Sequence, residues 1–149
     1  MTGQATATTE TITADELPPP VSQALAAFAE RHGITGLAAR AEMTVRTVTP
    51  SGPRRRLAQA AAPAISYAML LPGLLVVVTT AAEVTVTAWQ LAAAEARRIT
   101  ESFGGVWVTG LQLTAFRLGG TERQAIFISL AADGDGSGFE TAVLDRVSS

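Results

Sequence analysis

The sequence predicts a mainly β protein of the α+β class, with seven antiparallel strands, one C-terminal helix and an additional N-terminal helix. Three observations support this prediction: an uncharged apolar stretch interrupted by a Pro-Gly pair, several segments in which apolar and polar residues alternate, and an amphipathic segment near the end of the chain. A chain of 149 residues that is 48% hydrophobic suggests one domain with ample material for a core.

The apolar stretch from Leu57 to Ala82 contains 26 residues without a charge, and its conformation decides the architecture. Pro72-Gly73 lies between two apolar runs and marks a turn, because proline presets φ and glycine accepts positive φ. The second run is mostly β-branched, which suits a strand buried on both faces. We therefore expect a hairpin with strands at 62–71 and 74–80.

The alternative for the same stretch is a single-pass membrane helix. About 20 apolar residues span a bilayer, and Arg54, Arg55 and Arg56 before the stretch would mark its cytoplasmic side. A spanning helix would leave residues 1–56 with one short helix and one strand, which is too little to bury a core. We therefore prefer the hairpin to the membrane helix. The predicted fold and the predicted cellular location of the protein both depend on this choice.

The N-terminal residues 1–19 are expected to be a disordered tail that ends in a proline-rich linker, because they are polar and aperiodic. A single domain is expected over 20–149. It begins with a helix over 20–32, where apolar residues recur at helical spacing and Gly33 suits the position after the last turn. His32, the only histidine, is interpreted as a capping or packing residue.

Strands are also expected outside the hairpin. Their predicted ranges are 37–48, 83–88, 94–99, 106–113 and 123–131. The alanine-rich segment 94–99 favours a helix by composition, and its assignment as a strand depends on the resemblance described below. In the last strand, Ile126, Ile128 and Leu130 are predicted to face the core, with Phe127 on the opposite face.

The final helix is predicted over 138–147. Ser137 and Glu140 fit a capping box, in which the two side chains bind each other's backbone amides, and Phe139, Ala142, Val143 and Val147 then share one face. The preceding run from Asp133 resembles the start of a calcium-binding EF-hand loop, with Asp133, Asp135 and Ser137 at ligand positions. Leu144 occupies the place of the required bidentate glutamate, so a glycine-rich turn is expected instead of a metal site.

The composition excludes several chemistries. The chain contains no cysteine and no lysine, which removes disulfides, thiolate nucleophiles, Schiff bases and the P-loop lysine. A single histidine does not supply a metal constellation or a Ser-His-Asp triad. The acidic pairs Glu95 with Glu101 and Asp133 with Asp135 have no partner base and are interpreted as surface charges. We therefore expect no enzymatic activity, no cofactor and no metal.

The charges are unevenly distributed. The net charge of −2 and the pI near 5.4 argue against a nucleic-acid binder, yet residues 31–60 hold six arginines and a single acid. The candidate residues for an anionic partner are Arg40, Arg46, Arg54, Arg55 and Arg56. A solvated strand face next to an arginine-rich loop explains the same residues without a partner.

The location expected from the sequence follows from the choice between hairpin and helix. No basic segment followed by an apolar one is visible at the N-terminus, so the hairpin predicts a cytoplasmic protein and the spanning helix predicts an inner-membrane protein. The abundance of alanine and threonine, together with the absence of lysine and asparagine, is typical of a GC-rich bacterial genome.

Three parts of the sequence together resemble bacterial pleckstrin-homology-like domains. They are the hydrophobic hairpin Leu70–Val78, the paired strands within 106–118 and 123–131, and the closing segment Gly138–Val143. The resemblance covers about residues 37–147. It implies a bent antiparallel sandwich, or partly open barrel, with one end plugged by the last helix. Phe139 would stand where many such domains place a helix tryptophan.

The same resemblance implies a class of function. Members of the superfold are mostly non-catalytic and bind lipids, peptides or one another, so it implies a binding or scaffolding module whose partner is another protein or a second copy. Lipid-binding members use basic residues in an early loop, and Arg54, Arg55 and Arg56 would occupy such a loop here. Binding to an anionic lipid surface is therefore the alternative function.

Overall fold

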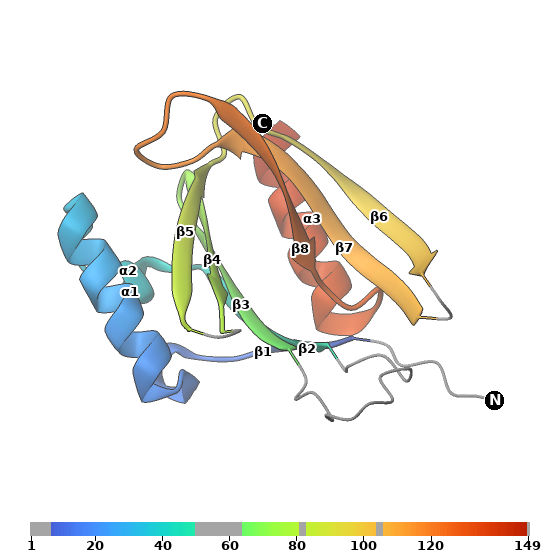
Figure 1. The fold of residues 1–149 in the computed structure, drawn as a ribbon, viewed down its shortest axis with the longest axis horizontal. Helices are drawn as coiled ribbons and strands as arrows, with labels where there is room; N and C mark the ends of the chain where they lie inside the picture. The colour runs from blue at the N-terminus through green and yellow to red at the C-terminus, as the bar shows by residue number, and fades with distance from the viewer. Residues whose placement is uncertain (1–6, 50–63, 81–82, 104–105, 149) are drawn as a thin grey trace.

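The computed structural model describes residues 7–49, 64–80, 83–103 and 106–148. Within them, eight strands form two antiparallel sheets that do not close into a barrel, accompanied by helices at both ends of the chain (Figure 1). The elements in chain order are β1 (Thr8–Thr11), the 3₁₀ turn η1 (Ala14–Glu16), α1 (Pro19–His32), α2 (Leu37–Arg40), β2 (Met43–Thr49), β3 (Ala64–Leu71), β4 (Leu74–Thr79), β5 (Thr85–Gln90), β6 (Glu95–Phe103), β7 (Val106–Phe116), β8 (Arg123–Ser129) and α3 (Gly134–Ser148).

Sheet A has the strand order β1-β2-β3-β4-β5 and sheet B has the order β6-β7-β8. The sheets approach each other at two corners. At one corner the hydroxyls of Thr49 and Ser129 are 3.1 Å apart, and at the other Trp89 of β5 forms an isolated bridge with Arg117 after β7. Helix α3 packs against strands of both sheets, and Phe139 and Val143 are fully buried in the core between them.

The predicted hairpin is confirmed. Strands β3 and β4 pair in antiparallel register around Pro72-Gly73, and Gly73 has a φ of +79°, which favours glycine. The described residues contain no helix that is long and apolar enough to cross a membrane. The alternative of one helix from Leu57 to Ala82 is therefore wrong for residues 64–80, while 57–63 and 81–82 lie outside the described residues.

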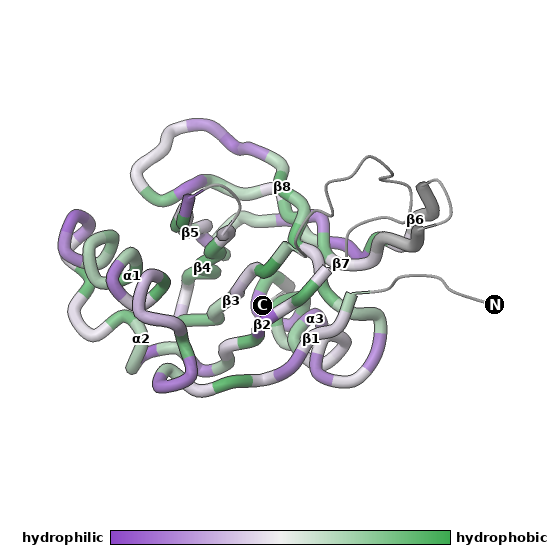
Figure 2. Tube along the Cα trace, turned by 60° about the horizontal axis from the view of Figure 1, so that its bottom comes forward, coloured by the Kyte–Doolittle hydropathy of each residue, from purple (hydrophilic) through white to green (hydrophobic). Residues whose placement is uncertain are grey.

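The hairpin is apolar on both faces because sheet A separates two cores. One face contributes Leu70 and Leu75 to the core shared with sheet B and α3. The other face contributes Met69 and Val76 to a second core beneath α1 and α2. Figure 2 shows the resulting contrast between hydrophobic residues along β4 and hydrophilic residues on the outer turns of α1. Burial of each large apolar side chain contributes about 1.5–3 kcal/mol, so the double coverage stabilises this sheet strongly.

The N-terminal segment differs from the prediction of a disordered tail. Residues Thr8–Thr11 form β1, which pairs with β2. The hydroxyl of Thr9 accepts the backbone amide of Ala131 at 2.8 Å and lies 2.9 Å from the hydroxyl of Thr47. The amide of Thr11 donates to Asp135 at 2.8 Å. These contacts are mainly polar, so the segment lacks the apolar alternation by which a strand is detected in a sequence.

The helix predicted over 20–32 is confirmed as α1, and Gly33 ends it in the left-handed conformation. The strand predicted over 37–48 is correct from Met43 onward, but residues 37–40 form the short helix α2 instead. Leu37 explains the difference, because its side chain is buried in the core beneath α1 and the segment LAAR has high helix propensity.

The four remaining strand predictions are confirmed, with shifted ends. They correspond to β5, β6, β7 and β8. Strand β6 forms because pairing with β7 along its whole length overrides the helix propensity of its first residues. Ile128 and Leu130 are buried and Phe127 lies on the opposite face, as the alternation predicts.

The start of the last helix differs from the prediction. Helix α3 begins at Gly134, four residues before the predicted start, so Ser137 lies inside the helix and does not cap it. Glu140 instead binds Arg98 of β6. Gly136 is needed because a Cβ atom there would lie 2.3 Å from the carbonyl oxygen of Ala131. The glycine-rich run therefore allows the close turn from β8 into α3.

Candidate functional site

The predicted arginine site is only partly within the described residues. Arg40 is exposed at the end of α2, and Arg46 on β2 forms an ion pair with Glu10 of β1. The hydrogen bond to Glu10 raises the pKa of Arg46, and burial opposes the rise. Arg54, Arg55 and Arg56 lie outside the described residues. Arg46 thus serves the β1–β2 contact.

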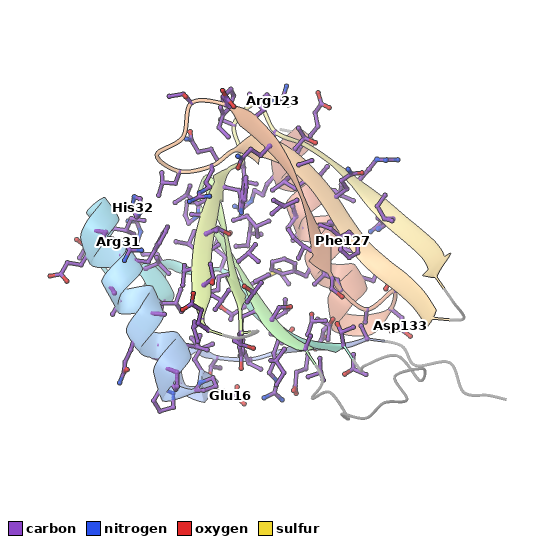
Figure 3. All side chains as sticks on the ribbon, viewed as in Figure 1. Glu16, Arg31, His32, Arg123, Phe127 and Asp133 are labelled. Atoms are coloured by element: carbon purple, nitrogen blue, oxygen red, sulfur yellow. The ribbon has the colours of Figure 1, made fainter. Side chains whose placement is uncertain are left out.

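Figure 3 shows Arg31 and His32 at the end of α1. The ring centroid of His32 is 4.4 Å from that of Phe28, and the guanidinium of Arg31 is 5.8 Å from the centroid of the same Phe28 ring. The two rings are tilted by 40°, and this ring contact agrees with the packing role predicted for His32. Next to it, a hollow of about 450 Å³ is lined by the β7–β8 loop, including Gly119, Gly120 and Glu122. The hollow lies at a loop tip and brings no acid–base pair into contact in the described residues.

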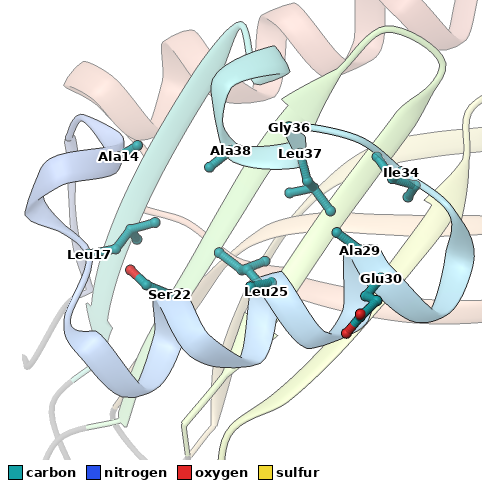
Figure 4. Close-up of a pocket in the computed structure, with 11 residues that line it drawn as sticks. Ala14, Leu17, Ser22, Leu25, Ala29, Glu30, Ile34, Gly36, Leu37 and Ala38 are labelled. Carbon is teal, nitrogen blue, oxygen red and sulfur yellow. The ribbon is translucent and has the colours of Figure 1, made fainter.

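A groove of about 520 Å³ lies between α1, η1 and α2. Its walls are mainly apolar, and Leu25 of α1 and Leu37 of α2 point toward each other across it (Figure 4). Ser22 and Glu30 are the polar side chains among the lining residues. The groove continues the second core to the surface, and its lining matches the packing of two helices more closely than the recognition of a polar ligand.

The junction of β6 and α3 contains a buried carboxylate. Glu140 is 3% exposed, and its Oε1 accepts a hydrogen bond from Nε of Arg98 at 2.9 Å. The same guanidinium donates from Nη2 to the hydroxyl of Thr141 at 2.8 Å. Burial raises the pKa of Glu140, and the hydrogen bond and charge of Arg98 oppose this rise. The pair attaches β6 to α3 and fixes the position of the strand.

Strand β6 forms one edge of sheet B, and in the part of the chain that the structure describes no strand pairs with its outer side. The direction of its backbone groups follows from the neighbouring ladder. The amide of Leu130 donates to the carbonyl of Thr109, so the backbone amide and carbonyl of Thr109 point toward β8. Those of the next residue, Gly110, therefore point toward β6. Gly110 is opposite Ile99, so the backbone amide and carbonyl of Ile99 point toward β7 and not toward the open edge. The alternate residues Ala96, Arg98, Thr100 and Ser102 consequently point their backbone amides and carbonyls toward the open edge.

The charged side chains in the first half of β6 are bound back onto the protein. Arg97 donates from Nε and Nη2 to Oε1 of Gln112 on β7, at 3.1 and 2.9 Å. Glu95 forms an ion pair with Arg123 at 3.6 Å, and Arg98 is bound to α3 as described above. Charges that reach past an edge strand normally protect it from further pairing. Here they are directed away from the edge, so the backbone groups between them stay accessible.

The outer face of sheet B continues this surface. Arg97, Gln112 and Phe127 are direct neighbours in register across β6, β7 and β8. Phe127 is the large hydrophobic residue that the described residues leave exposed, at 43%, and Figure 3 shows its place on β8. We name β6 together with this row the β6 surface. It offers unpaired main chain at its edge and a guanidinium, an amide and an aromatic ring beside it.

Sequence reasoning did not identify the β6 surface as a candidate site. The segment EARRITESF carries a helix-like composition, and edge position is a tertiary property with no local signature. Comparison with protein-family models, curated proteins and solved structures finds no match to this chain. The candidate site therefore depends on the geometry and chemistry of the chain's own residues.

Proposed function

We propose that this protein is a non-catalytic binding module of the pleckstrin-homology-like type, which holds an extended segment of a partner polypeptide against the open edge of β6. The observation that carries the proposal is an edge strand whose charged side chains in its first half, Glu95, Arg97 and Arg98, are bound to neighbouring elements and not directed past the edge. An extended segment added there would continue sheet B by one strand.

The energetics favour strand addition at this place. The four outward residues of β6 offer about eight main-chain hydrogen bonds to an added antiparallel strand, two for each directly bonded pair. Each contributes about 0.5–1.5 kcal/mol net, which is opposed by the ordering of the incoming segment. Arg97, Gln112 and Phe127 would then contact alternate side chains of that segment and provide selectivity. Arg97 has five donors, and its Nη1 is free of the bond to Gln112.

Two features support the domain type. The seven strands β2–β8 lie in two antiparallel sheets and are followed by the closing helix α3, which agrees with the sandwich and last helix that the resemblance implies. Phe139 occupies the buried position on the closing helix that it would fill in such a domain. Strand β1 and helix α1 are additions to that order.

A non-catalytic role is supported by how the polar groups are used. Glu140 binds Arg98, Asp135 accepts the Thr11 amide, and the ring of His32 contacts that of Phe28. These contacts hold elements of the fold together. In contrast, the backbone groups on the outer side of β6 have no strand partner among the described residues.

The test is selection of random linear peptides displayed on phage by the full chain, with Thr100→Pro as the blocked variant and Thr100→Ala as its control. Proline removes an outward amide and is tolerated on an edge strand, whereas alanine keeps the amide. We expect enriched peptides to bind the parent and Thr100→Ala, but not Thr100→Pro, and to slow hydrogen exchange at the amides of residues 96, 98 and 100. Equal binding to a folded Thr100→Pro variant, or no enriched peptide at all, would contradict the proposal.

A further inference from the structure

We infer that the segment that fits the β6 edge best is β6 of a second copy of this chain, paired antiparallel about a two-fold axis at Ile99. This inference rests on the proposed function and names its partner. The resulting sheet would contain six strands, in the order β8-β7-β6 and then β6-β7-β8 of the second copy.

The geometry of antiparallel pairing limits the choice of register. Residues directly opposite each other lie on the same face of the sheet, and side chains alternate between faces. A two-fold axis perpendicular to a continuous sheet must therefore pass through a residue and cannot lie between two residues. The central candidates on β6 are Arg98, Ile99 and Thr100.

Charge separates these three registers. An axis at Arg98 places Arg98 opposite its own copy and Glu95 opposite Glu101, which are like-charge pairs that destabilise a sheet. An axis at Thr100 avoids like charges but places Arg97 opposite Phe103. Only the axis at Ile99 places Arg97 opposite Glu101, and symmetry produces that favourable pair twice.

The backbone directions agree with the register at Ile99. Arg98 and Thr100 point their amides and carbonyls outward, and this register places each opposite the other as a hydrogen-bonded pair. Ala96 and Ser102 pair in the same way. Ile99 bonds inward to β7, so the two copies of Ile99 face each other at the axis as a non-bonded pair, where side chains lie closest.

Among the described residues, no strand lies along the outer side of β6. Figure 1 shows β6 at the outer margin of sheet B, with α3 on the inner face. Arg97 lies on the outer face, where Gln112 holds its guanidinium and leaves Nη1 for a carboxylate. The sequence of β6 is thus complementary to itself in charge, and its backbone groups are directed to meet their own copies.

The test is charge reversal measured by sedimentation equilibrium of the full chain over a range from about 1 to 500 μM. We expect the parent chain to be a dimer at high concentration, and Arg97→Glu or Glu101→Arg alone to weaken dimerisation at least about tenfold, because each change creates two like-charge pairs. The double variant Arg97→Glu with Glu101→Arg should restore the parent affinity to within about threefold. Within one chain the two residues are four positions apart on one strand, so restoration requires pairing between chains.

Thr100→Pro should also prevent dimerisation, while Thr100→Ala should not, and thermal unfolding verifies that each variant is folded. A parent chain that stays monomeric over the whole range would overturn this inference. So would a dimer that is unchanged by the single reversals and by Thr100→Pro. A monomeric chain that still selects edge-binding peptides would overturn only the self-pairing, because peptide selection tests the proposed function separately.

Discussion

The buried pair of Arg98 and Glu140 gives a prediction whose size follows from the structure. Arg98→Ala removes the donor that lies 2.9 Å from a carboxylate buried to 3% exposure. Leaving a buried charged acceptor without its partner costs about 1–3 kcal/mol, and the side chain of Arg98 is itself 51% exposed, so the lower part of that range applies. We expect a loss of about 1–2 kcal/mol at neutral pH, which corresponds to roughly 2–8 °C in Tm.

The same pair predicts how that loss depends on pH. Burial raises the folded-state pKa of Glu140 above its unfolded value, so the stability linked to this group is present below the unfolded pKa and is lost as pH rises through the folded pKa. Removing Arg98 removes the attraction that limits the rise. The deficit of Arg98→Ala should therefore be largest at pH 7 and should shrink as pH falls toward 4, where the carboxyl is protonated.

The assay is urea denaturation followed by circular dichroism at pH 7 and pH 4. Arg117→Ala is the matched control, because Arg117 is exposed and the described residues give it no ion pair; we expect a change within about 0.5 kcal/mol. In a Glu140→Gln background, Arg98→Ala should cost less than in the parent. A deficit equal to that of Arg117→Ala, or one that grows as pH falls, would refute the assigned role of the pair.

Three further predictions concern the fold. Gly136→Ala should destabilise the protein by about 2 kcal/mol or more, because the added Cβ would lie 2.3 Å from a backbone oxygen. In the same helix, a Cβ at Gly138 would meet nothing within 4 Å, so Gly138→Ala should be neutral or stabilise by up to about 1 kcal/mol. Urea denaturation of both variants measures the difference. Phe139→Ala should cost about 3–5 kcal/mol because the ring is fully buried, and Phe127→Ala should cost less than about 1 kcal/mol; similar losses for the two would contradict the core assignment. Thr9→Val should cost about 1–2 kcal/mol in the same assay through two lost hydrogen bonds, and an unchanged midpoint would show that β1 contributes nothing.

Much of the fold could be predicted from the sequence because its signals are local. Two adjacent residues, Pro72 and Gly73, are enough to predict the turn, and the apolar runs beside them are long enough to identify paired strands. The alternation in residues 123–131 correctly separates Ile128 and Leu130 from Phe127, since side chains of a strand alternate between faces. Helix α1 shows its apolar spacing and its terminal glycine directly.

Other parts were decided by contacts between distant residues. Thr8–Thr11 forms a strand because its hydrogen-bond partners are β2, the amide of Ala131 and the carboxylate of Asp135. The four polar residues alone do not predict these distant partners. Glu140 fits a local capping box, but a longer-range bond to Arg98 is available once β6 lies beside α3. Local rules therefore failed where a polar group had a better partner far along the chain.

By itself the sequence determined that the chain is mainly β, that its apolar middle turns back at Pro72-Gly73, and that a helix with Phe139 on its apolar face closes it. These features depend on turn residues and periodicity, which are properties of neighbouring positions. Only the tertiary structure decided that β6 is an edge and that its arginines bind elsewhere, because an edge exists only once the order of strands is known.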